Sequence, residues 1–417
     1  MLAALAAGVK GNKWFSLIDK IYAARTLGLA WEKVRVNAGA CGVDGITVAR
    51  FGKDSQTRLL AVKEQLQRNR YQPRPVKRVW IPKPGSADKR PLGIPTVTDR
   101  VVQAAVRLVI EPIFEREFAP TSFGFRPGRG CRDALRRVDG LLASGHLHVV
   151  DIDIKGYFDA IPHARLMAAV AEHVADGRVL ALLESFLKAG VMEDRESHET
   201  ESGTPQGGVI SPLLANIYLN ALDWLLIGSG LAAVRYADDI VVLCRDAASA
   251  RAALAKVREW LERAGLRLHE GKSRVVDMGQ PGQHFDYLGY RFWRGRGGGL
   301  RRFIRPKSRA ALRARLKPLT RRANGQSLRA IVARLNPILA SWYGYFRHVS
   351  AGVLNETDGW VRGRLRALLR KRRGGRGRGR GRDHQRWGNG YFAEAGLLCL
   401  ERLRAEELAS LRRGVTC

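Results

Sequence analysis

Three aspartates stand where short apolar segments of the sequence end. Asp153 lies near the end of the β-branched run LHVVDIDI, and Asp238 and Asp239 separate the two apolar segments of AAVRYADDIVVLCR. Such segments favour β-strands, and a short polar interruption between two of them favours a hairpin with its carboxylates at the tip. Carboxylates at neighbouring strand ends could hold two Mg²⁺ ions that activate an attacking hydroxyl and stabilise a leaving phosphate.

Each of these acidic segments also has a simpler interpretation. Taken singly, an acid at a strand end or in a hairpin turn is more often a solvated turn or a cap. An Asp-Asp pair between strongly apolar strands, however, lowers stability by charge repulsion unless a cation or a base neutralises it. The pair therefore favours a metal site, and because Asp153 precedes Asp238 by 85 positions, the fold must bring the two together.

The elements that would position these aspartates change in character along the chain. Residues 1–75 have a mainly helical pattern, whereas residues 76–130 are rich in Pro, Gly and basic residues and predict strands and loops. After the hairpin at 232–245, apolar residues recur at helical spacing until Gly265, at Leu254, Val257, Trp260, Leu261 and Ala264. The sequence thus predicts acid-bearing strands backed by amphipathic helices.

The charge of the chain indicates a polyanionic partner. Its 417 residues suggest two or three domains, and 72 Lys and Arg against 39 Asp and Glu give a net charge of +33. Residues 301–382 alone contain 24 Lys and Arg but two Asp and Glu, which suits nucleic acid or an anionic membrane surface. No run of about 20 apolar residues favours membrane insertion. Five scattered cysteines fit a reducing compartment.

The basic region beyond Phe292, where a domain boundary is expected, has parts of different character. Residues 327–349 combine a helical pattern with four aromatic residues, Trp342, Tyr343, Tyr345 and Phe346. These rings could stack on unpaired bases, but their spacing favours a packed helical core. Residues 371–382, KRRGGRGRGRGR, have low complexity and predict a flexible electrostatic arm.

Five motifs in a fixed order resemble those of reverse transcriptases. The segment DIKGYFD at 153–159 is similar to the first catalytic block of that family, and YADD at 236–239 to its Y-x-D-D box. Between them GTPQGG at 203–208 resembles the P-Q-G segment, and GLRL at 265–268 with Lys272, then FDYLG at 285–289, resemble later palm blocks.

This resemblance implies an α+β fold of the right-hand polymerase type. Fingers and palm, the palm being an antiparallel sheet backed by helices, would occupy residues 1–300. A helical thumb or maturase domain would follow at 301–370, and an Arg/Gly-rich arm with a short C-terminal segment at 371–417.

The resemblance also assigns roles to the aspartates. Asp153 and Asp238 would be direct ligands of two Mg²⁺ ions, for which Mn²⁺ is an alternative, and the Ile154 carbonyl is a further candidate ligand. Asp239 would complete the catalytic metal site as a supporting carboxylate.

Basic residues of the expected fingers would contact phosphates. Residues 74–95 resemble the motif that closes on an incoming triphosphate, with Lys83 and Arg90 as the candidate phosphate-binding residues. Lys77 and Arg78 fit better as contacts to the template backbone.

Three further residues would complete the nucleotide pocket by resemblance. Phe158 stands where a large ring would clash with a ribose 2′-hydroxyl, although from its residue type alone a core position is favoured. Gln206 would lie near the nucleotide and the template base, and Lys272 could act as a general acid toward pyrophosphate.

Residues 93–135 closely resemble the bacterial and organellar group II intron-encoded family. The basic region at about 305–370 resembles the thumb of that family, called the maturase or X domain, and residues 386–397 its closing segment. A template RNA, the group II intron RNA, a DNA primer or target and deoxynucleoside triphosphates would then be the partners, in a bacterial cytoplasm. The basic residues expected to contact nucleic acid are Arg301, Arg302, Arg305, Lys307 and Arg313.

Departures and alternatives limit this interpretation. Many members of the family end in a zinc-dependent H-N-H endonuclease whose Cys pairs are not found in this sequence, so second-strand cleavage is not expected. A domesticated or defence-associated reverse transcriptase acting on another RNA is one alternative. A non-catalytic RNA-binding splicing cofactor is another, against which the intact aspartates argue. The sequence does not indicate an oligomeric state.

Overall fold

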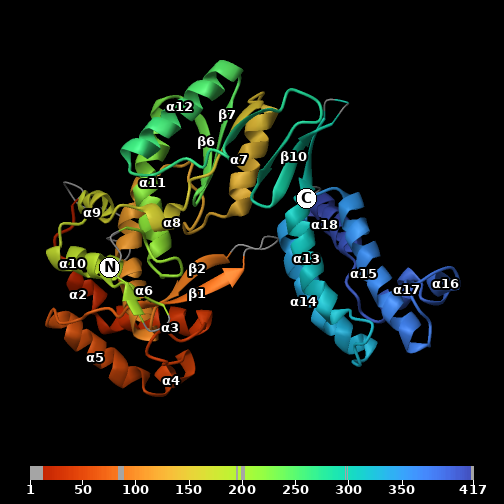
Figure 1. The fold of residues 1–417 in the computed structure, drawn as a ribbon, viewed down its shortest axis with the longest axis horizontal. Coiled ribbons are helices and arrows are strands. Elements are labelled where there is room, and N and C mark those ends of the chain that lie inside the picture. Colours follow the sequence, from red (N-terminus) through yellow and green to blue (C-terminus); the bar gives the residue numbers. More distant parts are fainter. Residues whose placement is uncertain are drawn as a thin grey trace. The chain divides into compact units, whose positions relative to one another are not determined.

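The computed structural model describes residues 13–82, 89–193, 196–198, 202–295, 297 and 299–414. Lys83, one of the two residues expected to bind a triphosphate, lies outside the described residues. The chain divides between Met278 and Gly279 into two units (Figure 1). Within the described part of the chain, no helix is both long enough and apolar enough to cross a membrane.

A four-stranded antiparallel sheet lies at the centre of the first unit, with the strand order β6-β7-β3-β8. Its strands are β3 (His148–Ile152), β6 (Ala232–Tyr236), β7 (Asp239–Cys244) and β8 (Arg274–Asp277). Successive residues of β7 are buried, so both faces of the sheet are covered. Helix α12 (Ala247–Arg263) packs on β3 and β7, while α7 (Cys131–Ala143) packs on β6 and β7. The predicted acid-bearing strands, hairpin and amphipathic helix are thus confirmed.

Helices and a second sheet surround this centre. From residue 13 onward, the N-terminal helical pattern is confirmed by α2 (Ile18–Ile21), α3 (Ala24–Asn37), α4 (Val48–Lys53) and α5 (Ser55–Gln67), while residues 1–12 lie outside the described residues. The second sheet has the order β2-β1-β4-β5 and consists of β1 (Val76–Pro82), β2 (Lys89–Ile94), β4 (Val191–Glu193) and β5 (Glu196–His198). Further helices of the unit are α8 (Tyr157–Ala160), α9 (His163–Ala171), α10 (Gly177–Lys188) and α11 (Ser211–Gly228).

The prediction of strands and loops throughout residues 76–130 is wrong, because α6 (Val97–Glu117) is a long buried helix within that range. Thr96 caps this helix: its hydroxyl oxygen accepts a hydrogen bond from the Asp99 backbone nitrogen at 3.1 Å and donates one to the Asp99 carboxylate at 2.6 Å. Apolar residues then line most of its circumference, as in a helix enclosed by other elements. A T-x-x-D start followed by an apolar run was the signal that would have predicted it.

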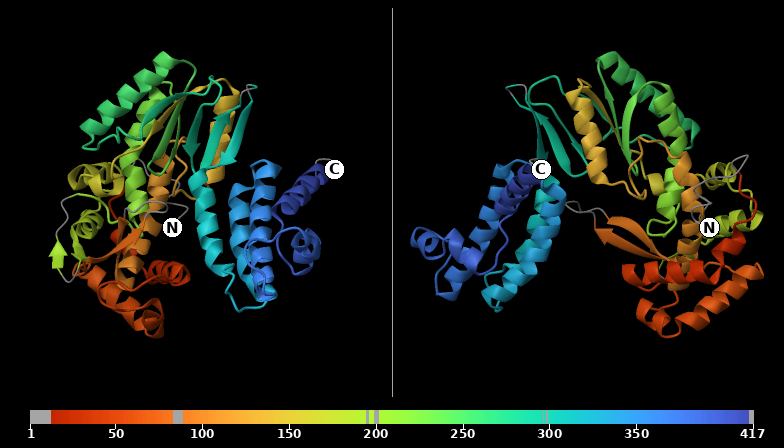
Figure 2. Two further views of the ribbon diagram at one scale, coloured as in Figure 1. Left: turned by 45° about the vertical axis from the view of Figure 1, so that its right-hand side comes forward. Right: turned by 180° about the vertical axis from the view of Figure 1, so that it is seen from behind.

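The second unit combines a small sheet with a helical part. Its sheet is β11-β10-β9, formed by β9 (His284–Tyr287), β10 (Tyr290–Arg294) and β11 (Leu300–Ile304). The helices are α13 (Pro306–Leu319), α14 (Leu328–Phe346), α15 (Ala351–Arg372), α16 (Arg382–Arg386), α17 (Asn389–Glu394) and α18 (Leu400–Gly414). Figure 2 shows the long helices of this unit, coloured cyan to blue, running side by side.

The aromatic residues of α14 attach the small sheet to the helices. Tyr343 and Phe346 are buried, as the core interpretation predicted. The Tyr290 hydroxyl donates to the Tyr345 carbonyl at 2.6 Å, and the Tyr345 hydroxyl donates to the Leu288 carbonyl at 2.8 Å. These bonds join the strands and the helices of the second unit, which begins at Gly279.

The Arg/Gly-rich segment differs from the flexible arm that its composition predicts. It folds back against the end of α15, where the Arg370 guanidinium donates to the Arg376 carbonyl at 2.9 Å and also pairs with Asp383. Asp383 in turn accepts a hydrogen bond from the Arg380 backbone nitrogen at 2.9 Å. Asp383 thus ties the segment to α15 through Arg370 and Arg380.

Candidate active site

The YADD segment forms a tight hairpin between β6 and β7. Tyr236 pairs with Asp239 across the hairpin, so Ala237 and Asp238 make a two-residue turn. Ala237 has a φ of 58°, in the left-handed region that is unfavourable for a residue with a side chain. A turn of this kind therefore needs support from its surroundings, and it presents Asp238 beyond the ends of both strands.

Asp153 lies at the neighbouring strand end. The register of β3 and β7 pairs Ile152 with Ile240, so the chain reaches Asp153 beside the start of β7. Its backbone is held by the segment after α12: the Asp153 carbonyl accepts from the His269 backbone nitrogen at 2.8 Å. The Asp153 backbone nitrogen donates to the Ser273 hydroxyl at 3.0 Å. The first catalytic block and the segment around Lys272, which are far apart in sequence, are thereby joined at one end of the strands.

The electrostatics of the two carboxylates suit a cation. Burial raises the pKa of Asp238 above its ordinary value, and the negative charge of Asp153 raises it further. The Lys272 ammonium lies 3.4 Å from both carboxylate oxygens of Asp153 and supplies one compensating charge. Among the described residues, no three His, Cys, Asp or Glu side chains form a group that could hold a metal ion. Asp239 is exposed at the start of β7.

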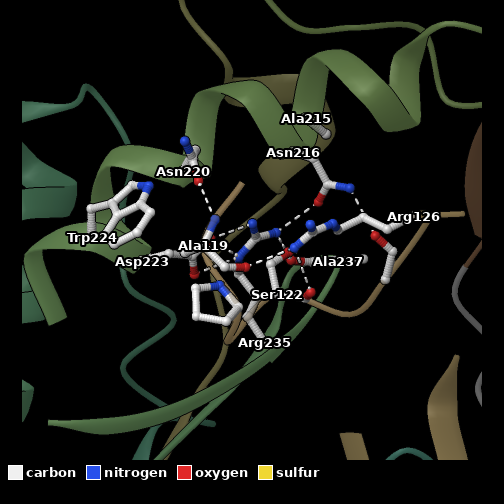
Figure 3. A network of polar contacts seen from close by, with 12 residues as sticks. Ala119, Ser122, Arg126, Ala215, Asn216, Asn220, Asp223, Trp224, Arg235 and Ala237 are labelled. Carbon is white, nitrogen blue, oxygen red and sulfur yellow. Dashed lines mark hydrogen bonds and ion pairs between the residues drawn. The ribbon is translucent and has the colours of Figure 1, made fainter. Parts of the chain in front are cut away.

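A buried ion pair that the sequence patterns did not predict supports the YADD turn (Figure 3). Arg235 and Asp223 are 0% and 1% exposed, and the Arg235 Nε donates to the Asp223 carboxylate at 2.8 Å. The same guanidinium donates from Nη1 to the Ala237 carbonyl at 2.9 Å and to the Asn216 amide oxygen at 2.8 Å. An arginine directly before YADD, with an apolar strand on its N-terminal side, was the available signal.

The loop that follows α6 packs directly on this turn. A Cβ atom added to Gly124 would lie 2.3 Å from the Ala237 nitrogen, so a side chain there is sterically excluded. The Asn216 amide donates to the Gly124 carbonyl at 2.7 Å. Arg126 fixes the rest of the loop by donating to the Ser122 carbonyl at 2.9 Å (Figure 3). It also pairs with Glu115 at 2.7 Å. Part of the segment 93–135 is thus a support for the hairpin.

The P-Q-G segment lies between the first catalytic block and the second sheet. Gly203 has a φ of 89°, and a Cβ atom there would lie 2.9 Å from the Asp159 Cα. Gly207 has a φ of 113°, and its Cβ atom would lie 2.3 Å from the Gly93 carbonyl oxygen of β2. The Gly93 nitrogen donates to the Gln206 carbonyl at 2.6 Å. These close approaches connect β2, which carries Arg90, to the loop that carries Gln206.

The residues expected to bind the nucleotide surround this loop. The Gln206 amide donates to the Asp159 carboxylate at 3.3 Å, and Thr204 donates from its backbone to the Phe158 carbonyl at 2.7 Å. Phe158 is half-buried against the core, which agrees with both of its interpretations. Arg90 is exposed on β2, opposite Ile81 of β1.

The basic residues expected to contact nucleic acid have different surroundings. Lys77 is exposed on β1, whereas Arg78 pairs with Glu193 at 3.4 Å. In the second unit, Arg305 lies 3.5 Å from the Asp286 carboxylate, and Arg302 lies over the Tyr290 ring at 5.7 Å. The Arg313 guanidinium lies 5.5 Å from the centre of the Trp360 ring, and Arg301 and Lys307 are exposed.

An antiparallel sheet with carboxylates at neighbouring strand ends is the arrangement typical of the reverse transcriptase class. The family model "Reverse transcriptase (RNA-dependent DNA polymerase)" matches residues 81–292, about half of the chain. The model "Group II intron, maturase-specific domain" matches residues 309–387. The chain therefore belongs to the reverse transcriptase family, as a group II intron-type member with a maturase-specific domain.

Curated relatives agree with this assignment. The group II intron-encoded protein LtrA of Lactococcus lactis subsp. cremoris is 42% identical over 195 residues, which cover 47% of this chain and 32% of that protein. Protein YkfC of Escherichia coli K12 is 40% identical over 189 residues, or 44% of this chain and 49% of that protein. The matches thus span a third to a half of the length of these relatives.

Proposed function

We propose that this protein is an RNA-directed DNA polymerase encoded by a group II intron, which makes cDNA and binds intron RNA to assist splicing and retromobility. The observation that carries the proposal is the meeting of Asp153 and Asp238 at adjacent strand ends, on a turn that Arg235 and Gly124 hold in place. Carboxylates so arranged, in a chain of the reverse transcriptase family, suit two-metal nucleotidyl transfer.

The acidic residues of the site would have different roles in metal binding. Asp153 and Asp238, with the Ile154 carbonyl, would hold divalent cations, and Asp239 would add negative charge nearby. The raised pKa of Asp238 fits this role, because a cation favours the ionised form that burial and Asp153 disfavour. Bound Mg²⁺ would supply neutralisation of the phosphate charge and a more acidic attacking hydroxyl.

Other residues would orient the substrates. Arg90 and Lys83 would bind the triphosphate, and Lys272, close to Asp153, would be placed to donate a proton to the leaving pyrophosphate. Phe158 and Gln206 would contact the sugar and the template base. Lys77 and Arg78 would contact the template backbone, and the five basic residues Arg301, Arg302, Arg305, Lys307 and Arg313 would contact RNA in the second unit.

Primer extension on an RNA template with deoxynucleotides and Mg²⁺ tests the polymerase. Asp238→Ala is expected to abolish extension while RNA binding is retained, because the charge removed is a metal ligand and not a contact to RNA. Asp277→Asn is the matched control: Asp277 pairs with His148 at the far end of β3 from Asp153 and should leave extension unchanged. Extension by Asp238→Ala, or none by the intact protein, would contradict the proposal.

A splicing role is supported by the maturase-specific match over residues 309–387 and by the high charge of that region. It is tested by splicing of the intron RNA that surrounds the gene, with and without the protein. Asp238→Ala should keep this activity, since RNA binding and polymerisation would use different residues. A protein that promotes splicing but never extends a primer would instead be the non-catalytic cofactor.

A further inference from the structure

The second unit contains a cationic cavity of about 440 Å³, which we name the Trp360 pocket. Its principal lining residues are Lys317, Arg322, Trp360, Arg364, Arg378 and His384. The volume lies within the range of about 300–1,000 Å³ that small-molecule sites occupy. Five of the lining residues are Lys or Arg and none is Asp or Glu, so an anionic occupant is favoured.

Two arginines, Arg322 and Arg364, approach one another in this pocket, and no carboxylate of the described residues lines it. Burial lowers the pKa of Arg364, and the neighbouring charge of Arg322 lowers it further. Arg364 is held in place because its guanidinium donates to the Thr320 hydroxyl at 3.0 Å and to the Lys317 and Thr320 carbonyls at 3.2 Å. Among the described residues, no carboxylate pairs with Arg322 or Arg378. An anion between these side chains would remove the repulsion.

Trp360 adds an aromatic surface to the same cavity. It is half-buried, and the guanidinium groups of Arg313 and Arg364 lie 5.5 and 5.8 Å from its ring centre. Cations gathered around a partly exposed aromatic ring are the combination that binds unpaired nucleotides: the cations bind the phosphate and the ring stacks on the base. Inorganic phosphate has no base that could stack on the tryptophan ring, so a nucleotide fits the pocket better than phosphate does.

The folded Arg/Gly-rich segment supplies one wall of the pocket. Arg378 and Gly379 both line it, and a Cβ atom at Gly379 would lie 3.0 Å from the Arg366 Cβ, so the segment packs closely on α15. The Arg366 guanidinium is occupied elsewhere, since it donates to the Trp387 carbonyl at 2.8 Å and to the Asn389 side chain at 3.1 Å. Three other cationic side chains of the pocket are exposed and can contact a ligand, namely those of Lys317, Arg322 and Arg378.

From this arrangement we propose that the Trp360 pocket binds one unpaired nucleotide of a single-stranded RNA, with its phosphate at Arg322 and Arg378 and its base at Trp360. RNA is the favoured source because residues 301–382 carry a charge excess suited to a long polyanion. The nucleotide must be unpaired, because a base in a duplex is stacked and cannot enter a cavity of this size. The inference rests on the proposed RNA-binding function and gives it a discrete site.

Fluorescence anisotropy of a labelled 12-nucleotide oligouridylate and of a blunt RNA duplex, measured on the full chain, tests the proposal. The substitution Trp360→Leu should weaken single-strand binding by about tenfold and duplex binding by less than about twofold, since a stacking surface is lost but no charge. Arg322→Ala with Arg378→Ala should also cost about tenfold on the single strand. Equal losses on both RNAs for Trp360→Leu would overturn the proposal.

The matched control removes two charges from the same unit without touching the pocket. Arg315 and Arg329 are exposed and do not line the cavity, so Arg315→Ala with Arg329→Ala should weaken single-strand binding by less than about threefold. If this control loses as much single-strand affinity as Arg322→Ala with Arg378→Ala, only the net charge of the unit matters and the proposed site is refuted. Thermal unfolding of each variant, expected within a few degrees of the intact protein, excludes misfolding.

Competitors distinguish the chemistry of the occupant. Uridine monophosphate should displace the oligonucleotide better than inorganic phosphate does, and Trp360→Leu should remove that difference. Equal competition by inorganic phosphate, or better competition by polyglutamate, would assign the pocket to a simple anion or to an acidic protein and overturn the proposal. The assay needs neither deoxynucleotides nor a divalent cation, so a failure of the polymerase proposal would not change its outcome.

Discussion

At the scale of single residues, Arg235 links the stability of the protein to the position of Asp238. Its guanidinium is fully buried and binds the Asp223 carboxylate, the Asn216 side chain and the Ala237 carbonyl together. Arg235→Met should lower the free energy of unfolding by about 3–5 kcal/mol, because it leaves the Asp223 carboxylate buried without a partner. Chemical denaturation measures this, and the double variant Arg235→Met with Asp223→Leu should be less destabilised than the single one.

The variant Arg235→Lys distinguishes the effect of Arg235 on the position of the YADD turn from its effect on the stability of the fold. An ammonium keeps the charge opposite Asp223 but cannot bind three acceptors in a plane, so the Ala237 carbonyl loses its donor. We expect a higher Mg²⁺ concentration for half-maximal primer extension, with less loss of stability than in Arg235→Met. An unchanged Mg²⁺ dependence would show that the ion pair only stabilises the fold.

Asp238 should make stability depend on pH. Burial and the charge of Asp153 raise the pKa of Asp238 in the folded state above the unfolded value of about 3.9. Above that pH the unfolded state releases the proton of Asp238, whereas the folded state still holds it. Stability is therefore lost as pH rises from about 4 through the raised pKa, and Asp238→Asn should be more stable than the intact protein at pH 7 but not below about pH 4.

Thermal unfolding across this pH range measures the difference, with Asp277→Asn, more than a third exposed, as the control. Added Mg²⁺ should raise the melting temperature of the intact protein at pH 7 and not that of Asp238→Asn, since binding to the folded state stabilises it. A larger advantage of Asp238→Asn at low pH would contradict the assignment.

Phe158 bears on the choice between ribose and deoxyribose. Its ring is half-buried beside the buried Tyr157, with ring centres 5.5 Å apart. If this ring lies under the incoming sugar, Phe158→Ala should raise ribonucleotide incorporation by at least about tenfold relative to deoxynucleotide, an effect of about 1.4 kcal/mol. Single-nucleotide incorporation kinetics measure the ratio, and an unchanged ratio would leave the ring as a packing residue.

At the scale of elements, the P-Q-G loop is fixed by glycines that touch other backbones. Gly207 combines a φ of 113° with a Cβ position 2.3 Å from the Gly93 carbonyl, so Gly207→Ala should cost about 3 kcal/mol and displace β2. Gly140→Ala in α7 meets nothing within 4 Å and should stabilise by about 0.5–1 kcal/mol. Denaturation curves of both variants test this, and equal effects would refute the steric argument.

The elements that sequence patterns predicted are those whose signals are local. The YADD hairpin follows from two apolar strands around a polar turn, and α12 from its helical spacing. Helix α6 was missed because prolines and basic residues near its ends outweighed its cap and apolar run. The folded Arg/Gly-rich segment could not be predicted, since Asp383, the residue that ties it to α15, lies outside the low-complexity stretch.

In the candidate site, too, residues with local sequence signals were predictable, whereas residues that depend on distant partners were not. Motif order identified Asp153, Asp238 and Lys272, which the fold brings together. The supports of the site depend on partners that are distant in sequence: Asn216 and Gly124 are 92 residues apart yet share a hydrogen bond. No spacing rule within one sequence would predict such a contact.

At the scale of the whole molecule, the net charge of +33 should dominate the affinity for nucleic acid. Each phosphate contact to a single strand releases counterions and contributes a slope of about −0.7 to the dependence of log affinity on log salt concentration. With about six contacts, RNA affinity should fall about 300-fold between about 50 and about 200 mM NaCl. Anisotropy titrations over this range measure the slope, while thermal unfolding in the same buffers checks that the fold is unaffected. A slope near zero would mean that the basic surface of this protein does not contact the RNA backbone.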